Sequence, residues 1–372
     1  MRSSRENRVR LLLAMTAFAV AGLVLVDQYH TSSTQTSALT SGTHPTTSTP
    51  GQGTSNPPSS PAPTAGTSTS SVPADSTTSS PATTAGSPAV TYPVATAQLS
   101  IEAHNLGGAV VPLPTTVLYP QANKGGPGRF PLIVFSPGFN IDPSVYLPLI
   151  STWAAAGFIV ANVSYPDTLP GSPLVETDMV NHPTELSQVI SDFVDGSVYV
   201  PASLSNLVDG SAVAVAGQSD GGDVSLASAA GSCCKDSRIK AAIILSGAEE
   251  TLYGDSYFAN GSPPILVVQG GQDTINAPAC SEQIYDGAPQ PRFYLAIPAA
   301  THLSAYSAPV GPELLVTRSV TVAFLEKYLE GAAISSAGLS DIAASQGSVA
   351  SMVSGTAAVP IVGSCLGAPP GP

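Results

Sequence analysis

The chain has 372 residues, of which 43% are hydrophobic and 10% charged, with a net charge of −13. This is enough apolar material for one large domain or two small ones. The acidic balance argues against a nucleic-acid partner, because no basic surface would neutralise phosphates, and it suits an exported protein.

The N-terminus has the pattern of an export signal. Four arginines (Arg2, Arg5, Arg8 and Arg10) precede an uncharged, mostly apolar run over residues 11–26. The run is slightly long for the core of a cleaved signal peptide and slightly short for a membrane span, and no clear cleavage motif follows it. Residues 1–30 are therefore expected to be a signal peptide or a membrane anchor, with the anchor favoured. The rest of the chain is expected to be extracellular or at the cell surface.

Two segments have the composition of unstructured chain. Residues 31–97 are dominated by Ser, Thr, Pro, Gly and Ala, too little apolar surface to offset the entropy of ordering, so they are expected to be a disordered stalk. Residues 332–372 are again small and polar and are expected to be a low-complexity tail, which Cys365 can tether by a disulfide. Residues 98–331 between them have the size of one catalytic domain.

Short apolar runs alternate with helical patterns along this central segment, which is typical of βαβ units and a mostly parallel sheet. Strands are expected over residues 115–119, 132–136, 158–163, 212–216, 241–245, 265–269 and 292–297. Helices are expected over residues 143–156, 183–194, 220–230 and 313–329, each followed by a nearby glycine that can end it. The fold class is therefore α/β.

Residues 217–222 read Gly-Gln-Ser-Asp-Gly-Gly, between the strand over 212–216 and the helix over 220–230. A sharp strand-to-helix turn of this kind holds the central serine in a strained conformation and exposes its hydroxyl. The turn needs glycine-sized neighbours, which Gly217 and Gly221 supply. The motif predicts Ser219 as a catalytic nucleophile.

A serine hydroxyl needs a histidine base and an orienting carboxylate, which follow the serine in the order acid and then histidine in this type of turn. His302 is the one histidine after Ser219 in the sequence. Asp273, on the loop after the strand over 265–269, is the favoured acid. Glu249 and Glu250, after the preceding strand, are the alternative.

Two backbone N–H groups are needed to stabilise the oxyanion, one of them from the residue after the serine. Asp220 is expected to supply that one, and Phe139, after the strand over 132–136, the second. Tyr146, Tyr165 and Met179 are expected to line an open substrate cleft. The sequence indicates no metal site and no cofactor.

The four cysteines are expected to be paired, because exported proteins fold in an oxidising compartment. Three pairings are compatible with the sequence. A bond between the neighbours Cys233 and Cys234 would close a strained small ring. One of them is therefore expected to pair with Cys280 and the other with Cys365.

Residues 130–139, 154–161, 217–222, 264–273 and 302–304 together resemble the α/β-hydrolase superfamily. The resemblance is closest to the dienelactone hydrolase, chlorophyllase and platelet-activating-factor acetylhydrolase group, together with the actinobacterial cutinase-like polyester hydrolases. It implies the α/β-hydrolase fold, with a mostly parallel central sheet flanked by helices and a small lid or none.

The same resemblance implies hydrolysis of carboxylic esters through an acyl-enzyme, with Ser219, Asp273 and His302 as the triad. The expected substrate is a small-molecule or lipid-like ester. Alternatives on the same fold are a polyester hydrolase, an acyltransferase or a non-catalytic cell-surface binding module.

Overall fold

The computed structural model describes residues 91–121, 128–254 and 256–365. The expected signal or anchor, and the expected stalk up to residue 90, lie outside these residues. The described part forms a nine-stranded sheet in the order β1-β2-β4-β3-β5-β6-β7-β8-β9. In chain order the strands are β1 (Val94–His104), β2 (Val110–Pro120), β3 (Phe130–Ser136), β4 (Ile159–Val163), β5 (Val208–Gln218), β6 (Ile239–Leu245), β7 (Ile265–Gly270), β8 (Arg292–Ile297) and β9 (Ser351–Ser354).

The centre of the sheet is parallel and its edges are antiparallel. Strands β4, β3, β5, β6, β7 and β8 run parallel, whereas β1 and β2 at one edge and β9 at the other are antiparallel to their neighbours. Parallel strands covered on both faces must be apolar throughout, and every residue of β3 and β7 is buried. The α/β class expected from the sequence is confirmed.

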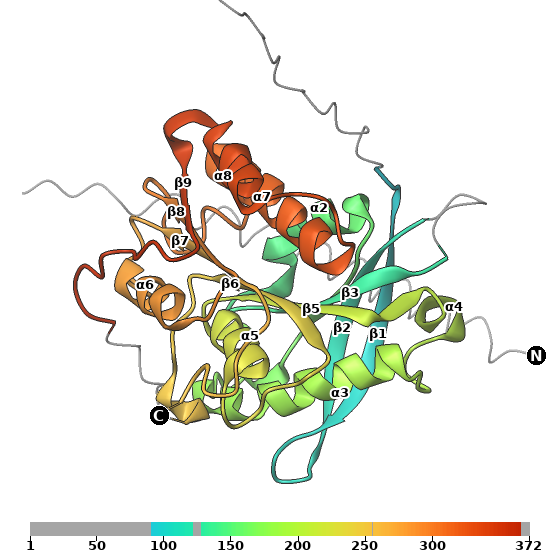
Figure 1. Cartoon of the computed structure of the whole chain (residues 1–372). Helices are drawn as coiled ribbons and strands as arrows, with labels where there is room; N and C mark the ends of the chain where they lie inside the picture. The colour runs from blue at the N-terminus through green and yellow to red at the C-terminus, as the bar shows by residue number, and fades with distance from the viewer. Residues whose placement is uncertain (1–90, 122–127, 255, 366–372) are drawn as a thin grey trace, which may run out of the picture. The chain divides into compact units, whose positions relative to one another are not determined.

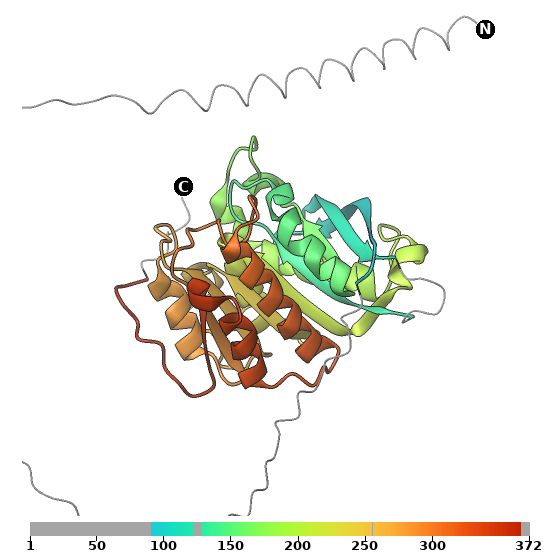
Figure 2. The same ribbon diagram turned by 90° about the horizontal axis from the view of Figure 1, so that it is seen from above.

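Helices cover both faces of the sheet, as Figure 1 and the perpendicular view in Figure 2 show. The α-helices are α2 (Leu147–Ala156), α3 (His182–Val194), α4 (Ala202–Ser205), α5 (Asp220–Ala230), α6 (Pro278–Gly287), α7 (Pro312–Leu329) and α8 (Ser336–Ala344). Helices α2, α7 and α8 lie on one face and α3, α5 and α6 on the other, each group over its own apolar core. Short 3-10 turns complete the described elements: η1 (Pro143–Tyr146), η2 (Pro166–Thr168), η3 (Glu176–Val180), η4 (Thr251–Tyr253) and η5 (Gly347–Val349).

Each strand and helix expected from the sequence is present; β8 and α5 have the expected ends, and the others are shifted at one or both ends. Strands β1 and β9 and helices α4, α6 and α8 were not expected. Strand β1 gives a weak signal because its outward residues alternate with small ones, and only Ile101 and Ala103 are fully buried. It is held instead by eleven consecutive residue pairings with β2.

The expected domain boundaries differ from the structure at both ends. At the N-terminal side, Tyr92 packs edge-on against Phe130 at 5.4 Å between ring centroids, so the folded region begins before residue 98. At the C-terminal side, the expected tail carries α8 and β9, and Leu339 is fully buried. Small residues hid these elements from sequence analysis, because their hydrophobic signal is weak although they fit closely against α7 and β8.

The expected disulfide connectivity is wrong. The structure pairs Cys280 with Cys365 and joins the neighbours Cys233 and Cys234. The chain after β9 returns to α6, where Tyr285 donates a hydrogen bond to the Ala357 carbonyl, and this docking brings Cys365 to Cys280. The pairing therefore depends on a long-range contact that residue spacing does not encode.

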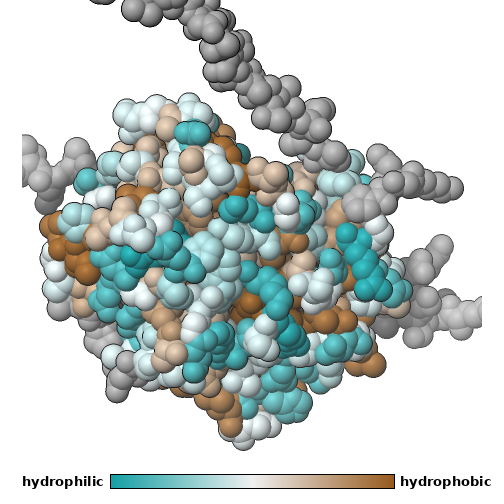
Figure 3. All heavy atoms as spheres, in the orientation of Figure 1, coloured by the Kyte–Doolittle hydropathy of each residue, from teal (hydrophilic) through white to brown (hydrophobic). Residues whose placement is uncertain are grey.

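The face shown in Figure 3 is a mosaic in which small hydrophobic areas are separated by hydrophilic residues. Among the described helices, none combines the length and the apolar character that a membrane span requires. The apolar run over residues 11–26 lies outside the described residues.

Candidate active site

Ser219 stands in the turn between β5 and α5. Its backbone has φ 56° and ψ −129°, a region that residues with a side chain rarely adopt. A Cβ atom at Gly217 would lie 2.0 Å from the Gly221 carbonyl oxygen, and one at Gly221 would lie 2.0 Å from that of Ser136. The two glycines are therefore what allows the turn to close, as the motif predicted.

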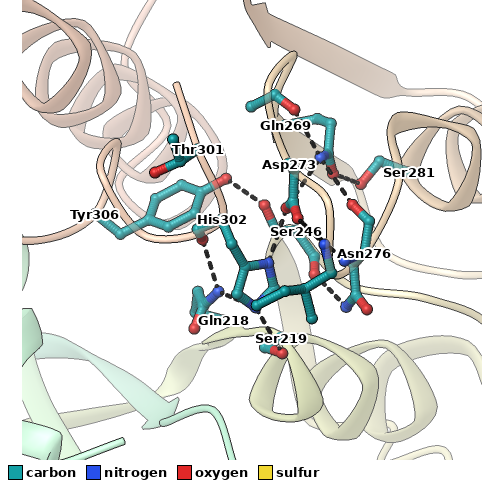
Figure 4. A network of polar contacts seen from close by, with 12 residues as sticks. Gln218, Ser219, Ser246, Gln269, Asp273, Asn276, Ser281, Thr301, His302 and Tyr306 are labelled. Carbon is teal, nitrogen blue, oxygen red and sulfur yellow. Dashed lines mark hydrogen bonds and ion pairs between the residues drawn. The ribbon is translucent and has the colours of Figure 1, made fainter. Parts of the chain in front are cut away.

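His302 and Asp273 meet Ser219 at the carboxyl edge of the sheet, where loops after β5, β7 and β8 converge. The Nε2 atom of His302 lies 3.0 Å from Ser219 Oγ, and its Nδ1 atom lies 2.8 Å from Asp273 Oδ2 (Figure 4). The structure thus brings together, in one hydrogen-bonded chain, the three residues that the sequence placed in the triad.

The Asp273 carboxylate is held on both oxygens. Its Oδ1 accepts hydrogen bonds from the backbone N–H groups of Ile275 and Asn276 at 2.9 and 3.0 Å, and its Oδ2 accepts one from Gln269 Nε2 at 3.2 Å. Burial alone would raise the pKa of Asp273, but the bonds from His302 and the backbone outweigh it and lower this pKa below its usual value. The group is therefore ionised and oriented toward the imidazole.

Glu249 and Glu250, the alternative acids, are not the hydrogen-bond partners of His302 Nδ1. Glu249 accepts a hydrogen bond from Gln283 at 3.0 Å. Glu250 lines the pocket beside Ser219, whereas Asp273 Oδ2 accepts the hydrogen bond from His302 Nδ1. The geometry favours Asp273.

Supporting residues around this chain were not identified from the sequence. Gln218 donates from Nε2 to the His302 carbonyl oxygen at 2.9 Å, and its Oε1 accepts a bond from Tyr146 Oη at 2.6 Å. Tyr306 donates to the Val268 carbonyl at 2.9 Å and contacts the Ser246 hydroxyl (Figure 4). Gln218 occupies the variable position before the serine of the motif, and it was the one sequence feature that could have pointed to these supporting residues.

The residues expected to stabilise an oxyanion, Phe139 and Asp220, both line the pocket that contains Ser219. Neighbouring backbone N–H groups are already engaged: that of Gly138 donates to Tyr146 Oη and that of Asn140 to the Thr168 carbonyl. The turn after β3 and the start of α5 both border the pocket at Ser219. The oxyanion role itself remains a proposal.

The pocket has a volume of about 300 Å³. Met179 lines it, as expected from the sequence. Tyr146 and Tyr165 do not, and for them the prediction is wrong, because both are core residues with at most 1% exposure. Tyr146 is bonded to Gln218, and Tyr165 stacks on His182 at 3.8 Å and contacts the Ser136 hydroxyl. Burial raises the pKa of both phenols, so they stay neutral.

This arrangement contains the parts required for nucleophilic acyl transfer: a strained serine, an imidazole bonded to its hydroxyl and an ionised carboxylate behind the imidazole. Within the described residues, no group of three His, Cys, Asp or Glu side chains is placed to hold a metal ion. The chemistry available to these residues is proton transfer and covalent attack by Ser219.

Two comparisons with known proteins bear on the chain. The family model described as Chlorophyllase matches residues 91–278, a segment that runs from the start of the described fold into α6 and includes Ser219 and Asp273. A search of curated proteins finds no match.

Proposed function

The chain belongs to the chlorophyllase family of the α/β-hydrolase superfamily, and from this premise we propose that it hydrolyses carboxylic esters through an acyl-enzyme on Ser219. The observation that carries the proposal is the continuous hydrogen-bonded chain from Asp273 through His302 to Ser219. Its two distances, 2.8 and 3.0 Å, lie within the reach required for proton transfer.

In the first half of the reaction, Ser219 Oγ attacks the ester carbonyl while His302 Nε2 takes its proton. The resulting imidazolium is stabilised by the Asp273 carboxylate on its other nitrogen. Negative charge develops on the carbonyl oxygen, where the backbone N–H groups of Phe139 and Asp220 are proposed to stabilise it. The imidazolium then protonates the departing alcohol, which leaves an ester on Ser219.

In the second half, His302 removes a proton from water, the hydroxide attacks the Ser219 ester, and the carboxylic acid leaves as the serine is reprotonated. A pocket of about 300 Å³ is at the small end of ligand sites, which favours short acyl chains. We therefore infer that short-chain esters are better substrates than long-chain lipids.

Hydrolysis of p-nitrophenyl acetate and butyrate by the purified protein tests this function. Replacing Ser219 by alanine should lower kcat by a factor of about 10³ or more, since the nucleophile is lost while binding is retained. The matched control is Ser319→Ala at a partly exposed position of α7, which should retain full turnover. Absence of turnover by the wild type, together with no labelling of Ser219 by a fluorophosphonate, would instead indicate a non-catalytic binding module.

We further propose that the catalytic region is exported. The arginines before the apolar run over residues 11–26 support this, as does the Cys280–Cys365 disulfide, since such bonds persist outside the cytoplasm. Protease added to intact cells that express the full chain should digest the catalytic region. Complete protection, with digestion only after lysis, would contradict export.

A further inference from the structure

The pocket beside Ser219 is lined by four carboxyl groups, those of Glu176, Asp220, Asp223 and Glu250. They come from three separate segments: η3, the first turn of α5, and the loop after β6. Among the described residues that line this pocket there is no lysine or arginine. The carboxyl groups of Asp220, Asp223 and Glu250 are therefore not balanced by a lysine or arginine in the described pocket wall.

Glu250 is a nearly buried member of this pocket wall. The residue is only 6% exposed, yet within the described residues its carboxylate makes no hydrogen bond and no ion pair. Its backbone carbonyl, by contrast, accepts a bond from Tyr257 Oη at 2.9 Å. A mostly buried carboxylate in a pocket wall is stabilised when a cation in the pocket pairs with it.

In the described part of the chain, Asp220 also has an unpaired carboxyl oxygen beside this pocket, whereas Asp223 is hydrogen-bonded to the backbone. The Oδ2 atom of Asp220 is buried and has no hydrogen-bond partner among the described residues. Asp223 is 3% exposed, and its Oδ1 accepts a short bond of 2.5 Å from the Ala248 N–H. Burial, followed by repulsion from neighbouring carboxylates, raises the pKa of Asp220 to about 7 and that of Asp223 well above its usual value.

This charge is adjacent to the place where the reaction develops more negative charge. The amide of Asp220 is a proposed oxyanion donor, and its own carboxylate, when ionised, opposes an oxyanion there. A positive group in the pocket would remove that conflict, since it would pair with the carboxylates and neutralise their repulsion. The aromatic ring of Phe139 also lines this pocket, and aromatic rings attract ammonium groups.

Resting on the ester hydrolysis proposed above, we propose that the pocket beside Ser219 binds a cationic group, an amine or quaternary ammonium, carried by the ester substrate. Glu250 is its main anionic contact. The enzyme then selects esters by charge as well as by size.

The test compares two acetate esters of the same shape that differ in charge: the choline ester and its carbon isostere, the 3,3-dimethylbutyl ester. At pH 8, above the pKa of about 7 of Asp220, kcat/KM should be at least about tenfold higher for the choline ester. In Glu250→Gln the ratio between the two esters should fall toward one. The control Asp341→Asn, a change of the same charge on the exposed side of α8, should keep the wild-type ratio.

Binding without turnover separates this proposal from the proposed function. Calorimetry on Ser219→Ala should show choline binding at least about tenfold more tightly than 3,3-dimethylbutan-1-ol, and Glu250→Gln added to it should abolish the difference. Choline selectivity without hydrolysis of any ester would refute the esterase and support the cation site. Equal hydrolysis of the two esters, or stoichiometric Ca²⁺ binding that displaces choline, would overturn the proposed organic-cation site while leaving the esterase in place.

Discussion

The backbone of Ser219 offers a test of stored strain at the candidate nucleophile. With φ 56° and ψ −129°, a residue with a side chain costs about 1–3 kcal/mol here. Glycine avoids this cost but loses about 0.5–1 kcal/mol more chain entropy on folding. Ser219→Gly and Ser219→Ala both lose the 3.0 Å contact with His302, so that loss cancels between them. The glycine variant should be the more stable of the two, by about 1 kcal/mol.

Urea or thermal unfolding of the two variants, with both disulfides intact, measures this difference. A change of 1 kcal/mol corresponds to about 2–4 °C in Tm for a domain of this order of size. The control is Ser225 inside α5. There the alanine variant should be more stable than the glycine variant, because glycine is about 1 kcal/mol worse than alanine in a helix. If Ser219→Ala equals or exceeds Ser219→Gly in stability while the control behaves as expected, the turn is not strained.

Three further changes probe buried charge, close packing and the C-terminal tether. Burial is the main cause that raises the pKa of Glu185 to about 7, and nearby carboxylates add to it. The folded state therefore keeps a proton that the unfolded chain loses above about pH 4.5. The free energy of unfolding then declines as the pH rises from 4.5 through 7. Glu185→Gln should therefore raise the free energy of unfolding at pH 8 by about 1–3 kcal/mol and not at pH 4, measured by urea titration. Gly221→Ala should abolish soluble folded protein, since its Cβ would lie 2.0 Å from the Ser136 carbonyl oxygen and this backbone clash costs more than about 4 kcal/mol. Replacing both Cys280 and Cys365 by serine should cost up to about 4 kcal/mol in urea unfolding, because the bond spans 85 residues.

Each of these expectations has a clear contrary result. An equal effect of Glu185→Gln at pH 4 and pH 8 would mean that lost packing, not ionisation, dominates. Normal yield and circular dichroism for Gly221→Ala would show that the turn can open. Unchanged stability of the double serine variant would show that β9 holds the C-terminal segment without the disulfide.

Much of the fold and of the site could be predicted because their signals are local. Continuous apolar runs mark strands buried on both faces, and β3 and β7 fulfil this along their whole length. The glycine-serine motif, its strand and its helix are adjacent in sequence, so the chemistry of Ser219 could be proposed from a few residues. Chain order then identified His302 and favoured Asp273, which the structure places in one hydrogen-bonded chain.

The tertiary structure alone decided features that depend on distant segments meeting. Cys365 reaches Cys280 only because the chain after β9 docks on α6, and Tyr165 is core because it stacks on His182 from another element. The carboxyl groups of Glu176, Asp220, Asp223 and Glu250 are separated along the chain and form one acidic pocket only after folding. Sequence patterns report the periodicity of single elements, whereas burial and charge at a site are set by every segment that packs there.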